Sequence, residues 1–441
     1  MNGKGLTVAA AVLAVLAGLL WWSNREKAKE ATAPPKDASP KILSLTEGDI
    51  QKVAIKKRGG EDTVVERDKS GKWSIAAPKP YGADQDAVNS LVSSAATVNS
   101  DRLVDEKPAD VKQYGIDSPS LEVDVTQKNG KTAKLLLGDD APGGTGTYAK
   151  LDGDPRLFTI ASFTKSGLDK TTKDLRDKRL LTFDQDKLSR VEVNSKDGNI
   201  EFGRNKDSWQ ILKPKPLRAD GLQIEELVRK LKDAKMDLNA SDDDTKKAAA
   251  SFAKGSPVAT IKVTDASGTQ DLRVVSEGGN YYAKSSVVDG AYKVPEDLGK
   301  SLAKKLDDYR NKKLFDFGFN EPGKVEMHAG GKTYSFQKSG EKWMSNGKEM
   351  DNTSVQSFLD KLRDLSASKF VESGFASPSI DVTVTSDNGK RVEKVFIAKA
   401  GDKYIAQREN EPSLYELESK TVDELTKAAG DVKAPPAATK K

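Results

Sequence analysis

The chain repeats one arrangement three times at nearly constant spacing. Short apolar runs lead into Trp73, Trp209 and Trp343, which lie 136 and 134 residues apart. This period falls within the usual size of a domain and predicts tandem copies of one unit. In the 441 residues we therefore expect three repeats, at residues 42–184, 185–318 and 319–432.

Each repeat opens with strand-like runs, in which apolar and polar residues alternate as they do when one face is buried. A second run and the Trp strand follow, so three consecutive strands predict an antiparallel meander. The first runs contain Val53 and Ile55, Val191 and Val193, and Val325 and Met327.

A helix is expected after each Trp strand, because apolar residues recur at i, i+3, i+4 and i+7. The three stripes are Val88, Leu91, Val92 and Ala95; Ile224, Leu227, Val228 and Leu231; and Val355, Phe358, Leu359 and Leu362. Asp84, Asp220 and Asp351 stand four residues before the stripes. Because Asp accepts hydrogen bonds from the free N–H groups of a first helical turn, these residues are interpreted as N-caps rather than catalytic carboxylates.

The second half of each repeat predicts another hairpin, a further strand led by a Tyr, and a closing polar helix. The hairpin turns are Asn129-Gly130, Ser267-Gly268 and Asn388-Gly389, and the Tyr residues are Tyr148, Tyr282 and Tyr404. Gly and Asn tolerate the positive φ of tight turns. The expected fold class is α+β, with strands outnumbering helices.

The first two repeats end in similar junctions with recurring cations. The cations are Arg176, Lys178 and Arg179, then Arg310, Lys312 and Lys313, each set followed by Leu and Phe. One interpretation is structural: cations complement a helix C-terminus while Leu and Phe anchor the link. The alternative makes the six cations contacts for a partner or lipid headgroup.

The N-terminus contains an uncharged run at residues 6–22, near the shortest length that crosses a bilayer as a helix. Trp21 and Trp22 end it, as expected at a membrane interface, and residues 1–5 form a short N-tail. A cleaved signal peptide is the alternative, but Trp21, Trp22 and Ser23 make a poor cleavage site. Lys/Arg counting alone would place Arg25, Lys27 and Lys29 inside. Because a short basic N-tail before a single apolar helix commonly stays in the cytoplasm, we expect a cytoplasmic N-tail with the body exported to the periplasm.

Residues 23–41 are rich in Pro and Ala and predict a spacer, and residues 433–441 predict a disordered tail. The net charge is only +5, with Lys interspersed among Asp and Glu. This pattern is unlike the basic footprint of nucleic-acid-binding proteins, so no nucleic-acid partner is expected.

Sequence motifs for catalysis, metals and cofactors are weak. His328 is the only histidine and lies on the polar side of a predicted strand, so a Ser-His-Asp triad would rest on it alone. The glycine-rich residues 138–146 lack the ending of a phosphate loop and are interpreted as a strand connection. Asp237 and Asp242–Asp244 lack the spacing of a calcium loop and are interpreted as a solvated loop. We expect no metal and no cofactor.

The tandem units, the sequence YGIDSP at Tyr114–Pro119 and the sequence LRDKRLLTF at Leu175–Phe183 resemble the bacterial family of domain of unknown function 4340. The resemblance covers nearly everything after Lys41 and brings no catalytic residues with it. It implies a single membrane anchor and an auxiliary role beside ABC-type transport systems similar to those of gliding motility.

The leading functional hypothesis is a non-enzymatic, single-pass protein of the cytoplasmic (inner) membrane that binds a partner, such as an ABC-type permease complex, through its tandem repeats. The alternative is a module that binds cell-envelope glycans or lipids through exposed aromatic residues and the junction cations. A third hypothesis, an uncharacterised hydrolase, needs acidic pairs converging from different repeats.

Overall fold

The computed structural model describes residues 40–144, 146–206, 208–238, 242–319 and 322–436. These residues form three separate hydrophobic cores, each containing one of the recurring Trp residues. The chain divides into two compact units, Met1–Lys178 and Arg179–Lys441. The first unit contains one repeat and the second unit contains two, and the strand-rich α+β class is confirmed.

The predicted membrane helix at residues 6–22 and most of the spacer lie outside the described residues. Among the helices of the described part, none is both long and apolar enough to span a bilayer.

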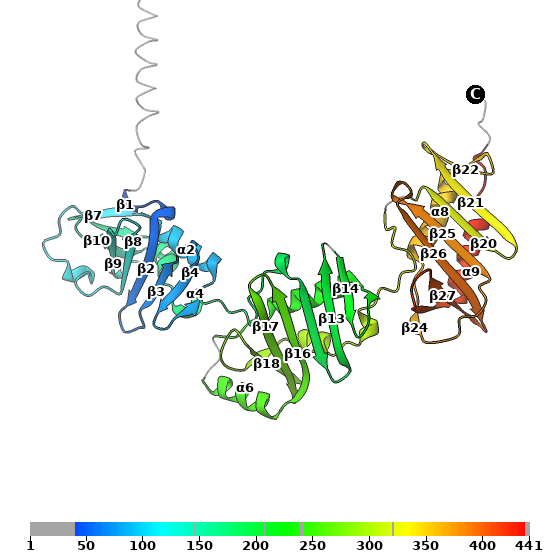
Figure 1. The fold of residues 1–441 in the computed structure, drawn as a ribbon. Helices are drawn as coiled ribbons and strands as arrows, with labels where there is room; N and C mark the ends of the chain where they lie inside the picture. The colour runs from blue at the N-terminus through cyan, green and yellow to red at the C-terminus, as the bar shows by residue number, and fades with distance from the viewer. Residues whose placement is uncertain (1–39, 145, 207, 239–241, 320–321, 437–441) are drawn as a thin grey trace, which may run out of the picture. The chain divides into compact units, whose positions relative to one another are not determined.

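The first repeat is built on a nine-stranded antiparallel sheet of order β5-β4-β3-β2-β8-β9-β10-β11-β7, with β1 and β6 forming a separate pair (Figure 1). Its strands are β1 (Lys41–Ser44), β2 (Ile50–Lys57), β3 (Thr63–Arg67), β4 (Trp73–Ala77), β5 (Tyr81–Gly82), β6 (Thr97–Asn99), β7 (Arg102–Asp105), β8 (Leu121–Gln127), β9 (Thr132–Asp140), β10 (Thr147–Leu151) and β11 (Leu157–Ile160). Its helices are α2 (Gln85–Ala96), α3 (Ser162–Leu168) and α4 (Thr172–Leu175), with 3-10 turns η1 (Glu47–Asp49) and η2 (Lys112–Tyr114).

The second repeat has an eight-stranded antiparallel sheet of order β15-β14-β13-β12-β16-β17-β18-β19. Its strands are β12 (Arg190–Ser195), β13 (Gly198–Asn205), β14 (Ser208–Lys213), β15 (Leu217–Arg218), β16 (Ser256–Asp265), β17 (Gly268–Glu277), β18 (Asn280–Ser285) and β19 (Tyr292–Val294). Its helices are α5 (Gly221–Asp233), α6 (Asp242–Lys254) and α7 (Glu296–Leu302), with 3-10 turns η3 (Gln185–Lys187) and η4 (Leu306–Asp308).

The third repeat returns to a nine-stranded antiparallel sheet, of order β23-β22-β21-β20-β25-β26-β27-β28-β24. Its strands are β20 (Lys324–Ala329), β21 (Lys332–Ser339), β22 (Lys342–Ser345), β23 (Lys348–Met350), β24 (Lys369–Val371), β25 (Ile380–Ser386), β26 (Arg391–Ala400), β27 (Lys403–Arg408) and β28 (Leu414–Glu418). Its helices are α8 (Asn352–Asp364) and α9 (Ser419–Gly430), with the 3-10 turn η5 (Asp387–Gly389).

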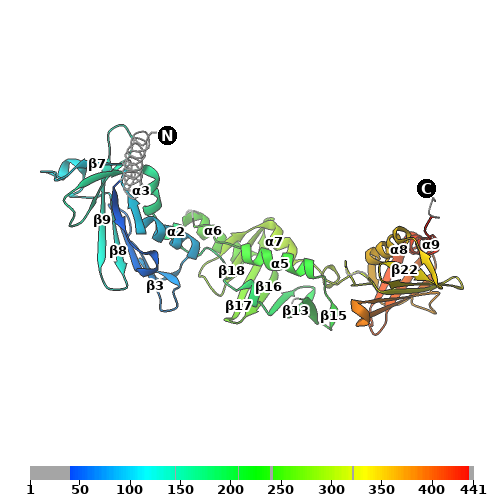
Figure 2. The ribbon, with the colours of Figure 1, turned by 90° about the horizontal axis from the view of Figure 1, so that it is seen from above.

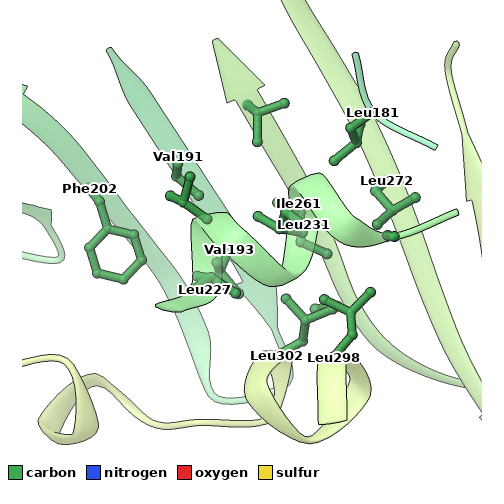
Figure 3. Packing of buried hydrophobic residues seen from close by; sticks show 14 of the residues in the cluster. Leu181, Val191, Val193, Phe202, Leu227, Leu231, Ile261, Leu272, Leu298 and Leu302 are labelled. Atoms are coloured by element: carbon green, nitrogen blue, oxygen red, sulfur yellow. The ribbon is translucent and has the colours of Figure 1, made fainter. Parts of the chain in front are cut away.

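The core of each repeat lies between one face of its sheet and the helices that contribute buried residues to it: α2, α3 and α4 in the first repeat, α5 and α7 in the second, and α8 and α9 in the third. In the second repeat α5 and α7 cover the same face of the sheet (Figure 2). Figure 3 shows Leu227 and Leu231 of α5 close to the strand residues Val193 and Ile261. All four are at most 1% exposed, and Leu298 of α7 joins the same cluster. The apolar stripes predicted from the sequence are therefore the faces that pack on the sheets.

The predicted helix caps are confirmed in all three repeats. Asp84 accepts hydrogen bonds from the first turn of α2, Asp220 from that of α5, and Asp351 from that of α8. These bonds satisfy backbone donors that have no partner inside the helix.

The chain enters each repeat by bonding to the end of that repeat's main helix. The backbone N–H groups of Leu45, Leu180 and Leu314 donate to the corresponding carbonyls of Ala96, Ala234 and Leu365, at 2.7, 2.8 and 2.9 Å. The junction residues Leu180 and Phe183 lie in the second core, and Leu314 and Phe317 lie in the third. Each junction therefore anchors the repeat that follows it.

The chain leaves each repeat beside the N-cap of the same helix. The N–H groups of Asp84, Asp220 and Asp351 donate to the carbonyls of Leu175, Tyr309 and Lys433, each at 2.8 Å. The backbone N–H of each cap residue is therefore satisfied by the departing chain, and Lys433 fills this position in the last repeat.

One local prediction was wrong: Asp242–Asp244 begin helix α6 and do not form a loop. Negative charge in a first turn favours a helix through its dipole, and the following alanines are strong helix formers. The helix packs against the sheet at its end, where a Cβ on Gly255 would lie 2.6 Å from Cγ2 of Val275. A glycine there permits this close approach.

The three Tyr residues expected to lead equivalent strands do not occupy equivalent positions. Ala149, Ala283 and Ala406 occupy equivalent ladder positions, opposite Phe158, Tyr292 and Tyr415. Tyr148 and Tyr282 directly precede their alanines, whereas Tyr404 lies two residues before Ala406. Because side chains alternate along a strand, Tyr404 points to the opposite face and packs against the third core.

Candidate functional site

The two recurring junction arginines are used structurally. The guanidinium of Arg176 stacks over the ring of Tyr81, with 4.0 Å between its central carbon and the ring centroid. Arg310 stacks over Phe370 at 3.4 Å and donates to the Ser413 hydroxyl at 2.9 Å. Stacking on an aromatic face is a favourable site for a guanidinium. Arg176 therefore packs within the first repeat, whereas Arg310 connects the junction to the third repeat.

The junction lysines behave differently. Lys313 pairs through its backbone with Ser366, while its side chain is exposed. Lys312 is also exposed, and its ammonium lies 3.5 Å from the carbonyl oxygen of Ser368. In the first junction, Lys178 is half-buried, and Arg179 pairs with Lys235 through the backbone.

Lys312 and Lys313 border a cavity of about 870 Å³ that we name the joint groove. Side chains from the second repeat, from the junction and from the third repeat line it. They include Trp209, Leu222, Lys304, Arg310, Lys312, Lys313, Ser366 and Ala367. Leu222 is 82% exposed, so the lining also includes an exposed apolar side chain. The groove exists because two repeats meet here.

The acidic residues in the joint groove are occupied by the protein itself. Asp220 caps α5, Glu225 accepts the indole N–H of Trp209 at 2.6 Å, and Asp308 accepts the backbone N–H of Lys305 at 2.8 Å. The ammonium of Lys304 donates to the neutral amide oxygen of Gln223 at 2.7 Å. Four cations (Lys304, Arg310, Lys312 and Lys313) and three carboxylates line the groove, and this small excess of positive charge favours an acidic ligand group.

A second cavity, of about 630 Å³, also lies where the second and third repeats meet. Its lining includes Arg218, Asp316, Arg391 and Glu411. This charged cluster was not predicted from the sequence. One signal was present: Arg218 stands where the first repeat has Gly82, two residues before the N-cap Asp in each case.

The single histidine is an exposed strand residue. Nδ1 of His328 lies 3.1 Å from Oδ1 of Asp381 on the neighbouring strand β25. The equivalent Lys56 donates to Glu122 at 2.6 Å and to Asp124 at 2.9 Å. These two hydrogen bonds raise the pKa of Lys56, and the bond from Lys56 lowers the pKa of Glu122. The position therefore carries a cross-strand polar pair in both repeats.

The glycine-rich segment, the possible metal ligands and the recurring aromatic residues were the other candidates from the sequence. Gly138–Asp140 end β9, and the described residues 141–144 and 146 belong to the connection to β10. Within the described parts of the chain, no group of three His, Cys, Asp or Glu residues is placed to hold a metal ion. The three recurring Trp residues are buried, whereas Phe163 and Phe319 are 80% and 91% exposed. Exposed aromatics are therefore specific to single repeats.

Comparison with protein families gives one result: the family model described as "Domain of unknown function (DUF4340)" matches residues 73–216 and 209–386. Each match starts at a Trp strand, crosses a junction and ends in the following repeat. No curated protein and no solved structure matches the chain.

Proposed function

This chain belongs to the DUF4340 family, whose model matches more than half of it, and we propose that it is a non-enzymatic binding protein whose joint groove docks a partner protein. The observation that carries the proposal is the groove itself, which is lined by both repeats and bordered by lysines. Tandem repeats create such composite surfaces without a reaction centre.

The partner we propose is the permease complex of an ABC-type transport system, with the chain as its auxiliary component. This assignment rests on the family resemblance and on the apolar run at residues 6–22, which would tether the repeats to the cytoplasmic membrane with the body in the periplasm. The lysines and the exposed Leu222 favour an acidic segment with apolar residues on that partner.

Crosslinked affinity purification of the full-length protein from native membranes tests this function. We expect a permease and its ATPase to be recovered with the wild type and lost with K312E/K313E. The matched control K262E/K399E reverses two exposed lysines outside the groove lining and should retain both proteins. If the wild type, K312E/K313E and K262E/K399E all recover the permease and its ATPase equally, the groove is not the docking site.

A glycan- or lipid-binding module is the second candidate, and the exposed rings of Phe163 and Phe319 favour it. The guanidinium of Arg363 lies 5.2 Å from the centroid of the Phe319 ring, so this aromatic has a cation beside it. Retention on anionic liposomes that falls with added salt, together with no recovered protein, would support this function.

A further inference from the structure

Arg218 reaches from the second repeat into the third. It lies on the edge strand β15, and its side chain is 18% exposed. Its guanidinium donates to the carbonyl of Lys313 at 2.8 Å and pairs with Asp316. It also donates to the hydroxyl of Tyr415 at 3.3 Å, and its Nε lies 3.8 Å from the Glu411 carboxylate. One side chain therefore contacts the junction and the third repeat together.

A second arginine, Arg408 of β27, completes the cluster from inside the third repeat. It donates to Glu411 at 2.8 Å and to the carbonyl of Leu314 at 2.7 Å. It also lies 3.3 Å from the carboxylate of Glu393 and 3.5 Å from that of Asp316. Arg391 of β26 also lies 3.7 Å from the Asp316 carboxylate, so Asp316 is shared by Arg218 of the second repeat and by two arginines of the third.

Further hydrogen bonds fix the shared carboxylate. The backbone N–H of Asp316 donates to Glu393 at 2.8 Å, and the amide of Asn311 donates to the Asp316 carboxylate at 3.0 Å. Arg391 lies 3.1 Å from Glu393. The cluster therefore contains three arginines and three carboxylates: Arg218, Arg391 and Arg408, and Asp316, Glu393 and Glu411. The charges balance in number.

The electrostatics favour keeping this cluster intact. Burial alone would lower the pKa of Arg218, but the charge of Asp316, followed by Tyr415 and Glu411, outweighs it and raises the pKa. A partly buried charge cluster tolerates separation poorly, because each freed side chain would lose its partner before it is fully hydrated. The ion pairs therefore resist movement between the two repeats.

We infer that Arg218 is a positioning residue that locks the second and third repeats into one arrangement and so preforms the joint groove. The lock itself stands on the contacts above, and only the use of the groove rests on the proposed function. A preformed site binds more tightly because less motion is lost on binding.

Distances between spin labels in the full chain test the lock directly. The natural sequence contains no cysteine, so labels attach only to cysteines that are introduced. One pair, at Asp197 and Lys390, reports across the joint, and a second pair, at Asp197 and Ala266, reports within the second repeat. All three positions are exposed.

In the otherwise wild-type chain we expect a single narrow distance for the pair across the joint. R218M should broaden this distribution while leaving the pair within the repeat unchanged. The control R229M removes an exposed arginine that pairs only within α5, and should change neither distribution. If R218M also broadens the pair within the repeat, D316N replaces it as the milder test variant.

An unchanged distance across the joint in a folded R218M or D316N protein would overturn the lock, and so would a broad distribution in the unmutated joint. These measurements need no partner. A narrow distance that depends on Arg218, combined with no recovered permease, would retain the lock and reject the proposed function.

Discussion

The second and third repeats begin with the same backbone arrangement but close it with different side chains. In the second repeat, the N–H of Thr182 donates to Gln270 at 2.8 Å, and Ser285 donates to the carbonyl of Leu180. In the third, the equivalent bonds run from Asp316 to Glu393 and from Arg408 to Leu314. A neutral set of hydrogen bonds has been replaced by a charged one.

The charged version has a consequence that the neutral one lacks. Asp316 can bind an arginine from the preceding repeat, and Arg218 supplies it. At the position of Arg218 the first repeat has Gly82, which has no side chain to donate, and Thr182 carries no charge. Two repeats with the same backbone arrangement can therefore differ in whether an ion pair holds them to the preceding repeat.

The largest expected effects come from the apolar anchors that both starts share. Leu180 and Leu314 are fully buried, so L180A and L314A should each cost about 2–5 kcal/mol. Hydrogen exchange of the full chain should lose protection in the second repeat for L180A and in the third for L314A. If protection is lost in the preceding repeat instead, each junction anchors the repeat before it and not the one that follows.

Exchanging the polar sets should be costly in both directions. D316T/E393Q gives the third repeat the neutral pair of the second but leaves Arg218 and Arg408 without two carboxylates. T182D/Q270E places two carboxylates where no matching arginines stand. We expect each double variant to lose about 2 kcal/mol in chemical unfolding.

If D316T/E393Q unfolds with the same free energy as the wild type, the charged hydrogen bonds at the start of the third repeat contribute no more than the neutral ones of the second. The single variant E393Q keeps an oxygen that can accept the N–H of residue 316, as Gln270 does for Thr182. A smaller loss for E393Q than for E393A would separate the backbone bond from the charge.

The helix caps should show no difference between the repeats. D220A and D351A each remove hydrogen bonds to the first turn of the main helix, and each should cost about 1 kcal/mol. Thermal unfolding of the full-length variants measures the cost, with the conservative D220N and D351N recovering most of it. A much larger cost in one repeat would reveal a role for that carboxylate beyond capping.

The smallest expected effect concerns the cross-strand pair that is charged in the first repeat and uncharged in the second. The hydrogen bond from Lys56 lowers the pKa of Glu122 below its ordinary value of 4.5. Its stabilisation is therefore present above about pH 4.5 and is lost as the pH falls through the lowered folded-state pKa. K56M should cost about 0.5 kcal/mol at pH 7 and less in acid.

The equivalent pair in the second repeat, Asn194 opposite Thr260, carries no charge. In thermal unfolding, the stability difference between N194A and the wild type should stay constant from pH 3 to 7. The difference between K56M and the wild type should instead shrink as the pH falls. A pH-independent cost for K56M would show that its side chain acts through packing alone.

Periodicity predicted most of each repeat, because its signals are local. The alternating strands, the apolar stripes of α2, α5 and α8, and the Asp caps depend only on neighbours along the chain. Helix α6 was missed because its acidic start was judged as a solvated charge run. The orientation of Tyr404 could not be predicted from spacing, because a shift of one residue hardly changes the pattern of the sequence but turns a strand side chain to the other face.

The candidate site could be predicted only in part. Lys312 and Lys313 were identified by their recurrence, and they do border the joint groove. The cluster around Arg218 joins residues as distant in sequence as Glu411, and the set does not recur, because Gly82 stands at the position of Arg218 in the first repeat and Thr182 at that of Asp316 in the second. Repetition therefore revealed the shared framework, while the features that distinguish one joint lie in what does not repeat.

A photo-crosslinking residue in place of Leu222, the exposed apolar side chain at the joint groove, tests whether the partner docks there. In native membranes we expect a crosslink to a permease subunit, identified by mass spectrometry, and none from the same residue at Val287, an exposed site outside the groove lining. Capture of the permease from Val287 but not from position 222 would contradict docking at the joint of the second and third repeats.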